Sequence, residues 1–446
     1  MIYLKDFTST LIKKLTSAIT IKNVSTILSR MIESGCCNIY KTSKDRNEYK
    51  KLSRTLSGDN SMSDISPATV NATLMEQASV ILGDSPRVYV IHDPSDIRKP
   101  YSSDTENLGQ VRDLNGKIIN GYSSHNAIAF IPIDQKILPL SHVSYSNKDP
   151  KFLKQEIIQK IKNGKDFEGQ AEATDLYNSG DYFNKKTLTT TEITRISNGL
   201  KRDNMSLEIT HVLDREFDDD DYLKLISETL SDFYVIRAKK SRTLDTKGDD
   251  GKKSKLINST FTGKEEKPFQ KLKFKKKHIQ DGKFIVEWCT YNKSNAVKIT
   301  VIDRKGNEVF EVPMLLLTNK PVNNLSAAFD IYMDYLKRSK IEYVFKFLKE
   351  GMGWEDIQIR NYKGIQNLLS LCFYMSAYLY LIGNESTLDD YSILFSEIGG
   401  GKGKVTRHFI LKGIMVLMAK YKVDEIFKEK KITSRKQERL RGIISV

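Results

Sequence analysis

Cysteine is scarce in this sequence, and its spacing excludes the usual cysteine-based chemistry. The 446 residues include four cysteines, and no two of them have the Cys-x-x-Cys spacing of common zinc and redox sites. Cys36 and Cys37 are adjacent, an arrangement that rarely forms a bridge, and Cys289 and Cys372 stand alone. We therefore expect neither a disulfide framework nor a zinc site, and a reducing cytosol suits the chain.

Long hydrophobic runs are also missing. The first 20 residues mix lysines with short apolar stretches and lack a small-residue cleavage site, so they predict no signal peptide. The longest apolar stretch, Leu368 to Ile382, has 15 residues and includes three tyrosines. This length is short for a membrane span and predicts a buried core helix instead.

Acidic residues are outnumbered by basic ones. The 71 Lys and Arg against 56 Asp and Glu give a net charge of +15. Such an excess favours a polyanionic partner, because each phosphate that a cation neutralises releases counterions. A basic protein without a nucleic-acid partner stays open on charge alone. The hydrophobic share of 39% suffices for a large core and for about two to four domains.

Residues 1–85 have the apolar spacing of helices. A basic stretch from Lys41 to Arg54 lies within this region, which we interpret as a helical N-terminal DNA-binding region. The apolar positions recur at Leu11, Leu15, Ile19, Val24, Ile27, Leu28 and Ile32.

After residue 85 the pattern changes to strands alternating with helices. The predicted order is three strands in a meander, then a helix, a strand, a helix and a strand. This order predicts a mixed α/β sheet of the ribonuclease-H-like kind. The strands are expected at 88–91, 122–133, 136–145, 206–213 and 233–238, and the helices near 150–163, 191–201 and 221–230.

A very basic stretch at 241–280 leads into further strand patterns at 284–291, 296–302 and 308–317, with a hairpin turn at Gly306-Asn307. The glycine-rich segment 399–404 lacks the spacing of a phosphate-binding loop and predicts a flexible joint. We divide the rest of the chain into a core at 86–250, a β-rich insertion at 251–318, completing core helices at 319–385 and a helical C-terminal region at 386–446 that is a candidate for dimerisation.

Carboxylates follow two of the predicted strands. Asp93 follows the first strand and Asp214 the fourth, and open α/β sheets bind their ligands at such strand ends. Glu342, on a predicted helix at 323–349, supplies a third carboxylate. Mg²⁺ prefers oxygen ligands of this kind, and two such ions assist phosphoryl transfer. Asp96 stays open as an alternative to Asp93.

The helix at 323–349 carries a polar stripe. Tyr335, Arg338, Glu342 and Lys349 fall on one face at about 100° per residue. Arg and Lys bind phosphate oxygens, and a phenol donates a hydrogen bond to one. Taken alone, the stripe is more typical of a solvated helix face with paired charges.

The spacing of these four residues resembles a known signature. The DDE transposases of bacterial insertion sequences, in the insertion-sequence-four type, carry Tyr-x2-Arg-x3-Glu-x6-Lys on the helix of their catalytic glutamate, and this chain reproduces that spacing in full. The resemblance covers about 88–385. It extends to HDPSDIRKPYS at 92–102, VRDLNGKIINGY at 111–122, LDREFD at 213–218, FYVIRAKKSR at 233–242 and LLLTNKPV at 315–322.

The resemblance implies a transposase that cuts DNA at transposon ends and joins it to target DNA. Asp93, Asp214 and Glu342 would be the catalytic metal ligands for two Mg²⁺ ions, with Mn²⁺ as a substitute. Tyr335, Arg338 and Lys349 would position the transposon-end phosphates. The implied partners are double-stranded DNA with terminal inverted repeats, target DNA, and a second copy of the chain in a homodimer. The implied location is the cytoplasm, at the nucleoid.

Several residues keep two interpretations. Arg237 and Lys239 line the DNA path or lie on a plain surface, and Trp288 stacks on a flipped base or packs in the insertion core. His92 and His211 contact metal-bound water or pack in the sheet. At the level of function, a catalytically silent, transposase-derived DNA-binding protein and a nuclease that cuts without joining stay open.

Overall fold

A ten-stranded sheet runs through the computed structural model, which describes residues 4–58, 63–113, 115–247, 253–274, 277–382, 390–429 and 433–434. Two further strands, β7 (Thr243–Lys247) and β8 (Lys253–Lys255), form a separate pair. The strands of the large sheet are β1 (Arg87–Arg98), β2 (Gly109–Arg112), β3 (Ile118–Ile131), β4 (Lys136–Tyr145), β5 (Glu208–Leu213), β6 (Phe233–Arg237), β9 (Gly263–Phe274), β10 (Lys277–Tyr291), β11 (Ser294–Ile302) and β12 (Met314–Thr318).

The strand order confirms the predicted fold class. Neighbouring strands follow the order β2-β3-β1-β5-β6-β12-β11-β10-β9, and β4 also pairs with β3. The pairs β1–β5 and β5–β6 are parallel, whereas the pairs around β3 are antiparallel. An antiparallel meander followed by parallel strands is the mixed α/β arrangement expected from the sequence, and it is consistent with a ribonuclease-H-like fold.

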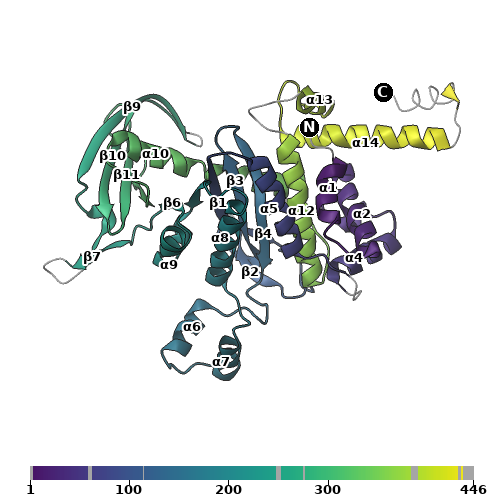
Figure 1. Cartoon of the computed structure of the whole chain (residues 1–446), viewed down its shortest axis with the longest axis horizontal. Coiled ribbons are helices and arrows are strands. Elements are labelled where there is room, and N and C mark those ends of the chain that lie inside the picture. The colour runs from purple at the N-terminus through teal and green to yellow at the C-terminus, as the bar shows by residue number, and fades with distance from the viewer. Residues whose placement is uncertain are drawn as a thin grey trace.

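The β-rich stretch continues the core sheet. β12 pairs with β6 through Leu316 and Arg237, and β11, β10 and β9 follow outward from it. These strands form the arm on the left of Figure 1. Two details differ from the sequence prediction. Within the predicted strand 308–317, Glu308 forms only an isolated bridge with Ile302, 309–312 are bends, and the strand begins at Met314. The lysine-rich β9 was not foreseen. Lysines suit β9, since a charged edge strand resists pairing with another chain.

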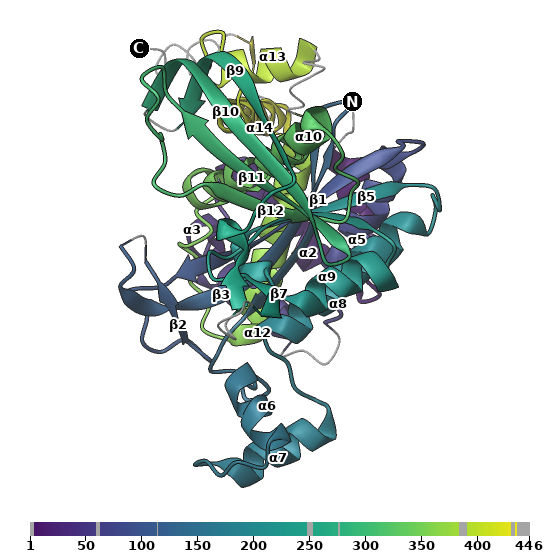
Figure 2. The ribbon, with the colours of Figure 1, turned by 90° about the vertical axis from the view of Figure 1, so that its left-hand side faces the viewer.

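Helices cover both faces of the sheet and extend beyond it. The pair α6–α7 projects away from the rest of the molecule in both views (Figures 1 and 2), and no residue of α7 is buried. The helices are α1 (Leu4–Ile12), α2 (Ala18–Ser34), α3 (Ile39–Thr42), α4 (Arg46–Ser57), α5 (Pro67–Leu82), α6 (Gln155–Lys162), α7 (Gln170–Ser179), α8 (Lys185–Lys201), α9 (Asp220–Lys224), α10 (Leu325–Leu336), α11 (Ser339–Lys346), α12 (Tyr362–Ile382), α13 (Asp390–Ile398) and α14 (Arg407–Glu429).

The strand β1 is buried on both faces, as its unbroken apolar run indicates. Tyr89 and Ile91 belong to a cluster that includes α12 and the N-terminal helices. Val88 and Val90 point the other way, into a cluster with α5 and α8. Successive side chains of a strand alternate between its two faces, so a continuous apolar run is what such a central strand requires.

The helix α12 confirms the predicted core helix. It is the one described helix long and apolar enough to cross a membrane, yet 89% of its most apolar window is buried inside the fold. It contacts α2, α4, α5 and β4, so it joins the N-terminal helices to the sheet (Figure 1). Burial among other helices explains its apolar composition.

The predicted helix at 323–349 is interrupted. α10 ends at Leu336 and α11 begins at Ser339. Across the break the backbone N–H of Arg338 donates to the carbonyl of Tyr335 at 3.0 Å, a tighter turn than the i to i−4 spacing of an α-helix. Residues Phe347–Gly351 then widen into a π-helical turn. The prediction of one continuous helix is therefore wrong, although its two halves remain consecutive.

Candidate active site

Asp93 and Asp214 lie on neighbouring strands. The parallel pairing of β1 with β5 runs to His92 opposite Leu213, so Asp93 and Asp214 are the next residue along each strand. Asp93 is still within β1, because the pairing with β3 continues to Arg98. The prediction that Asp93 follows the end of its strand is therefore wrong, because Asp93 lies within β1. Its position next to Asp214 agrees with the prediction.

The guanidinium of Arg338 joins the three carboxylates. Its Nη2 donates to Asp93 Oδ1 at 3.0 Å and to Asp214 Oδ2 at 3.4 Å. Its Nη1 donates to Glu342 Oε1 at 2.7 Å. The Tyr335 hydroxyl donates to Asp214 Oδ1 at 3.3 Å. The structure therefore brings together five of the residues singled out from the sequence.

Burial dominates the electrostatics of this group. Asp93 is 7% exposed, and burial raises its pKa to about 7, with Arg338 opposing the shift and Asp214 adding to it. Burial, with a smaller contribution from Asp214, raises the pKa of Tyr335 to about 12, so its hydroxyl stays protonated at neutral pH. Burial alone would lower the pKa of Arg338, but Asp93 and Asp214 outweigh it and raise that pKa.

The carboxylates have the chemistry of a divalent-metal site. Their oxygens are the hard ligands that Mg²⁺ prefers, and a cationic side chain already lies among them. Across the described residues, no three His, Cys, Asp or Glu side chains are grouped closely enough to hold a metal as they stand. The Nε of Arg338 is buried and has no hydrogen-bond partner there. The three carboxylates are a donor set of the kind that suits a divalent cation, and in this structure the Arg338 guanidinium pairs with all three.

Residues 182–379 match the transposase DDE domain family. This match supports a DDE transposase and indicates transposase function. It includes Asp214, Tyr335, Arg338 and Glu342 and begins after Asp93, which the fold places beside Asp214. A comparison of the chain with curated proteins finds no match.

Lys349 lies outside the Arg338 group. It lies within the residues that match the transposase family, and its Nζ donates to the Asp96 carbonyl at 2.9 Å and lies 3.4 Å from Glu355 Oε1. It therefore braces the β1 strand near Asp93. The Asp96 carboxylate instead accepts from the Ser123 hydroxyl at 3.3 Å. This geometry favours Asp93 over Asp96 as the ligand.

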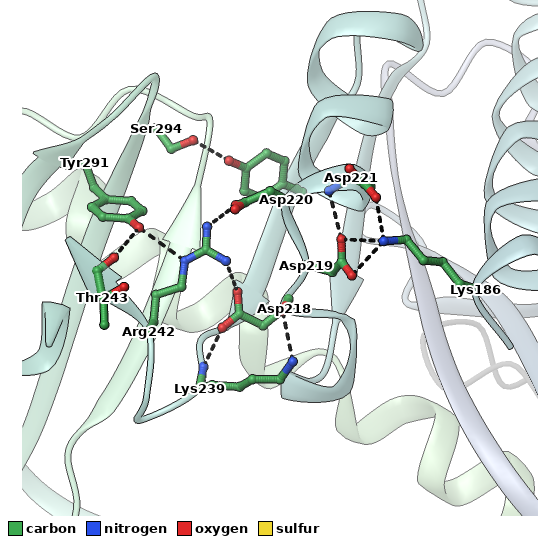
Figure 3. A network of polar contacts seen from close by, with 11 residues as sticks. Lys186, Asp218, Asp219, Asp220, Asp221, Lys239, Arg242, Thr243, Tyr291 and Ser294 are labelled. Atoms are coloured by element: carbon green, nitrogen blue, oxygen red, sulfur yellow. Dashed lines mark hydrogen bonds and ion pairs between the residues drawn. The ribbon is translucent and has the colours of Figure 1, made fainter. Parts of the chain in front are cut away.

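Lys239 takes part in a network at the base of the β arm. Its backbone N–H donates to Asp218 Oδ2 at 2.7 Å and its Nζ to the Asp218 carbonyl at 3.0 Å. Figure 3 shows the same carboxylate bonded to Arg242, which also reaches Tyr291 of β10. The network ties the segment after β5 to the arm. A DNA contact by Lys239 stays a prediction.

The acidic residues at 218–221 begin a helix, as the sequence predicted, and they also form ion pairs. Asp219 caps α9 by accepting from the Asp221 N–H, as expected, and it also pairs with Lys186 of α8 at 2.9 Å. Asp220 pairs with Arg242 (Figure 3). These ion pairs join residues that are far apart in the sequence. An acidic run with cations elsewhere in the chain is too common a pattern to predict which residues pair.

The other two predicted DNA contacts have different surroundings. Trp288 is 8% exposed, and an added Cβ at Gly263 of the neighbouring strand would come within 2.1 Å of its ring. This close packing favours the insertion-core interpretation. Arg237 is half-buried at the end of β6, where its charge acts on the Tyr335 hydroxyl and so lies near the carboxylate group.

Buried histidines lie behind Asp93. His92 contacts His125 at 3.3 Å and His211 at 3.0 Å through ring nitrogens, and His211 contacts Asp232 at 3.1 Å. Burial lowers the pKa of His92 far below its usual value and that of His125 to about 4, so both stay neutral. This arrangement favours the sheet-packing interpretation for His92 and His211. Neither His125 nor Asp232 was predicted. The pairing of β1 with β3 places His125 beside His92, and the pairing of β5 with β6 places Asp232, just before β6, beside His211.

Proposed function

We propose that this chain is a cut-and-paste DNA transposase of the insertion-sequence-four type, with Asp93, Asp214 and Glu342 as its catalytic carboxylates. The observation that carries the proposal is the convergence of these three carboxylates, from two adjacent strands and a helix, on the one guanidinium of Arg338. The transposase family match at 182–379 supports it independently.

Asp93, Asp214 and Glu342 would hold two Mg²⁺ ions. Bound there, the ions supply a more acidic water and neutralise charge on the phosphoryl group. Arg338, released from the carboxylates, keeps a positive charge suited to a phosphate oxygen, and the protonated Tyr335 hydroxyl donates a hydrogen bond. Lys349 holds the strand that carries Asp93, and in the proposal it also neutralises DNA phosphates.

The reaction has two steps on phosphodiesters. In the first, a water oxygen bonds to phosphorus at the transposon end and the 3′-oxygen leaves as a hydroxyl. In the second, that hydroxyl attacks a phosphodiester of target DNA, directly or after a hairpin, and displaces another 3′-oxygen. The chain's own contribution is to position the strands and to neutralise developing charge.

The proposed partners follow from the same chemistry. Double-stranded DNA with terminal inverted repeats is the substrate, target DNA the acceptor, and the net charge of +15 favours both. A homodimer would pair the two ends, with the C-terminal helices α13 and α14 as the candidate contact. Measuring the mass of the protein–DNA complex tests this dimer, and an active complex with one copy contradicts it.

Replacing Glu342 tests the site. Glu342→Ala should abolish end cleavage and leave end binding within about a factor of two, because its side chain is 60% exposed and supports no core packing. Glu350→Ala is the matched control, since Glu350 is a 70% exposed glutamate in the next turns of the same region. Cleavage by Glu342→Ala at near the wild-type rate would show that the site is assigned wrongly.

A further inference from the structure

A cleft lies between the N-terminal helices and the sheet. Its volume is about 1180 Å³, and its walls come from α3 and α4, from residues 99–105 after β1, and from residues 357–361 before α12. An adjoining hollow shares Lys99, Tyr101 and Gln358 with it and extends toward Arg98 and Glu355. The two hollows adjoin at these residues and are together called the groove, and the second reaches Arg98 at the end of the strand that carries Asp93.

Backbone contacts hold the groove in shape. The Tyr49 hydroxyl of α4 donates to the Gln358 carbonyl at 2.8 Å, and the Asn38 amide donates to the Asp356 carbonyl at 2.7 Å. On the opposite wall, Lys99 Nζ donates to the Ile357 carbonyl at 2.8 Å. The segment at 355–361 is therefore fixed from both sides, and the groove is present before any ligand binds.

Three basic side chains that line the groove have no ion-pair partner in the described part of the chain. They are Arg46 and Lys50 of α4 and Arg360 of the floor, and all three are exposed. Two acidic residues also line the cleft: the Asp45 carboxylate caps α4 by accepting from two backbone N–H groups, and Asp104 accepts from the Ser103 hydroxyl at 3.0 Å. An anion in this groove would meet several free cations.

Aromatic rings stand on both walls. Tyr40 is 58% exposed and packs edge-on against Tyr49, with 5.2 Å between the ring centroids. Tyr101, on the opposite wall, is fully exposed. Exposed rings beside free cations are the two elements by which proteins hold unpaired nucleotides, since bases stack on rings while cations follow the phosphates.

We propose that this groove binds a single DNA strand with unpaired bases, which stack on Tyr40 and Tyr101 while Arg46, Lys50 and Arg360 face its phosphates. The inference rests on the proposed function, because the strand would be the one that leaves the cleavage site. Six residues of extended chain separate Asp93 from Lys99, so the groove begins roughly 20 Å from the catalytic carboxylates.

Binding of a labelled single strand tests the groove. A fluorescent oligothymidine of about 12 nucleotides should bind the full-length wild-type protein, and the double variant Tyr40→Ala/Tyr101→Ala should bind it at least about tenfold more weakly by anisotropy. A duplex of the same length should lose less affinity, because its bases are already stacked. Tyr421→Ala, which removes a 64% exposed tyrosine on α14, is the matched control and should bind like wild type.

The outcomes separate this inference from the proposed function. Equal affinity of wild type and the double variant for the single strand, or an equal loss for strand and duplex, would overturn the inference. An unchanged melting temperature shows that the double variant is folded, as expected from the exposure of Tyr40 and Tyr101. Asp93→Asn should bind the single strand like wild type, because Asp93 lies outside the groove. If wild type binds the strand through Tyr40 and Tyr101 but never cleaves DNA, the proposed function fails and the groove inference stands.

Discussion

Asp93 is a buried carboxyl group whose ionisation depends on its neighbours. It lies inside β1, is 7% exposed and has one guanidinium contact, so removing its proton costs folding free energy. The folded-state pKa of about 7 exceeds the usual value for aspartate of about 3.9. The stability that the protonated form contributes is therefore present at low pH and is lost as pH rises toward 7.

Asp93→Asn should accordingly stabilise the metal-free protein in a pH-dependent way. The amide carries no charge, so the variant should exceed wild type by about 4 kcal/mol near pH 8, the equivalent of a pKa shift of about three units, and match it near pH 4. Urea unfolding with a chelator, across that range, measures the difference. A difference that does not change with pH would contradict the raised pKa.

The sequence identified most of the carboxylate group at this scale. Asp93 and Asp214 were found because strand patterns ended next to them, and Tyr335, Arg338 and Glu342 because their spacing places them on one face. The role of Arg338 as the shared partner of all three carboxylates could not be predicted, because it depends on the distance between β1, β5 and α11. His125 and Asp232 were missed for the same reason.

At the scale of elements, the β arm is fixed to the core by a buried ion pair. The Asp218 side chain is 1% exposed and Arg242 is 11% exposed, and Arg242 also donates to Tyr291 of β10. Periodicity does not reveal such joints. It likewise missed β9, whose lysines have the composition of a loop, and the break between α10 and α11, which shifts hydrogen bonds without changing the apolar spacing.

Arg242→Ala should destabilise the protein strongly. The substitution removes the cation that pairs with the buried Asp218 carboxylate and leaves it only its backbone hydrogen bond, an effect that typically costs about 3–5 kcal/mol. Lys293→Ala is the control, because Lys293 is 88% exposed in its pair with Glu228 and its loss should cost less than about 1 kcal/mol. Chemical denaturation measures the free energy of unfolding of both variants. Equal decreases would show that the buried Arg242–Asp218 ion pair stabilises the fold no more than an exposed one.

At the scale of the whole molecule, one sheet extends from the meander to the lysine-rich edge of the arm. The sequence predicted the mixed α/β core but treated the β-rich stretch as an insertion, because pairing of β12 with β6 leaves no local signal. The N-terminal helices join the same body through α12. The molecule therefore presents its carboxylates, its arm and its groove from one connected scaffold.

Binding to transposon-end DNA should depend steeply on salt. The net charge of +15 and the free cations of the groove imply several phosphate contacts, each of which releases counterions. Affinity should fall at least about tenfold between about 50 and 200 mM salt, measured by anisotropy. A flat response over this range would argue against phosphate contacts as the main source of affinity.

The most direct test of the account is a combined cleavage and strand-transfer assay on DNA that carries the inverted repeats flanking the gene. Wild type should cut and join DNA in Mg²⁺ or Mn²⁺, and Asp93→Ala should do neither while still binding the ends. Cutting without joining would indicate a nuclease. Binding by wild type without any cutting, under either metal, would contradict the proposed activity and favour a catalytically silent DNA-binding protein.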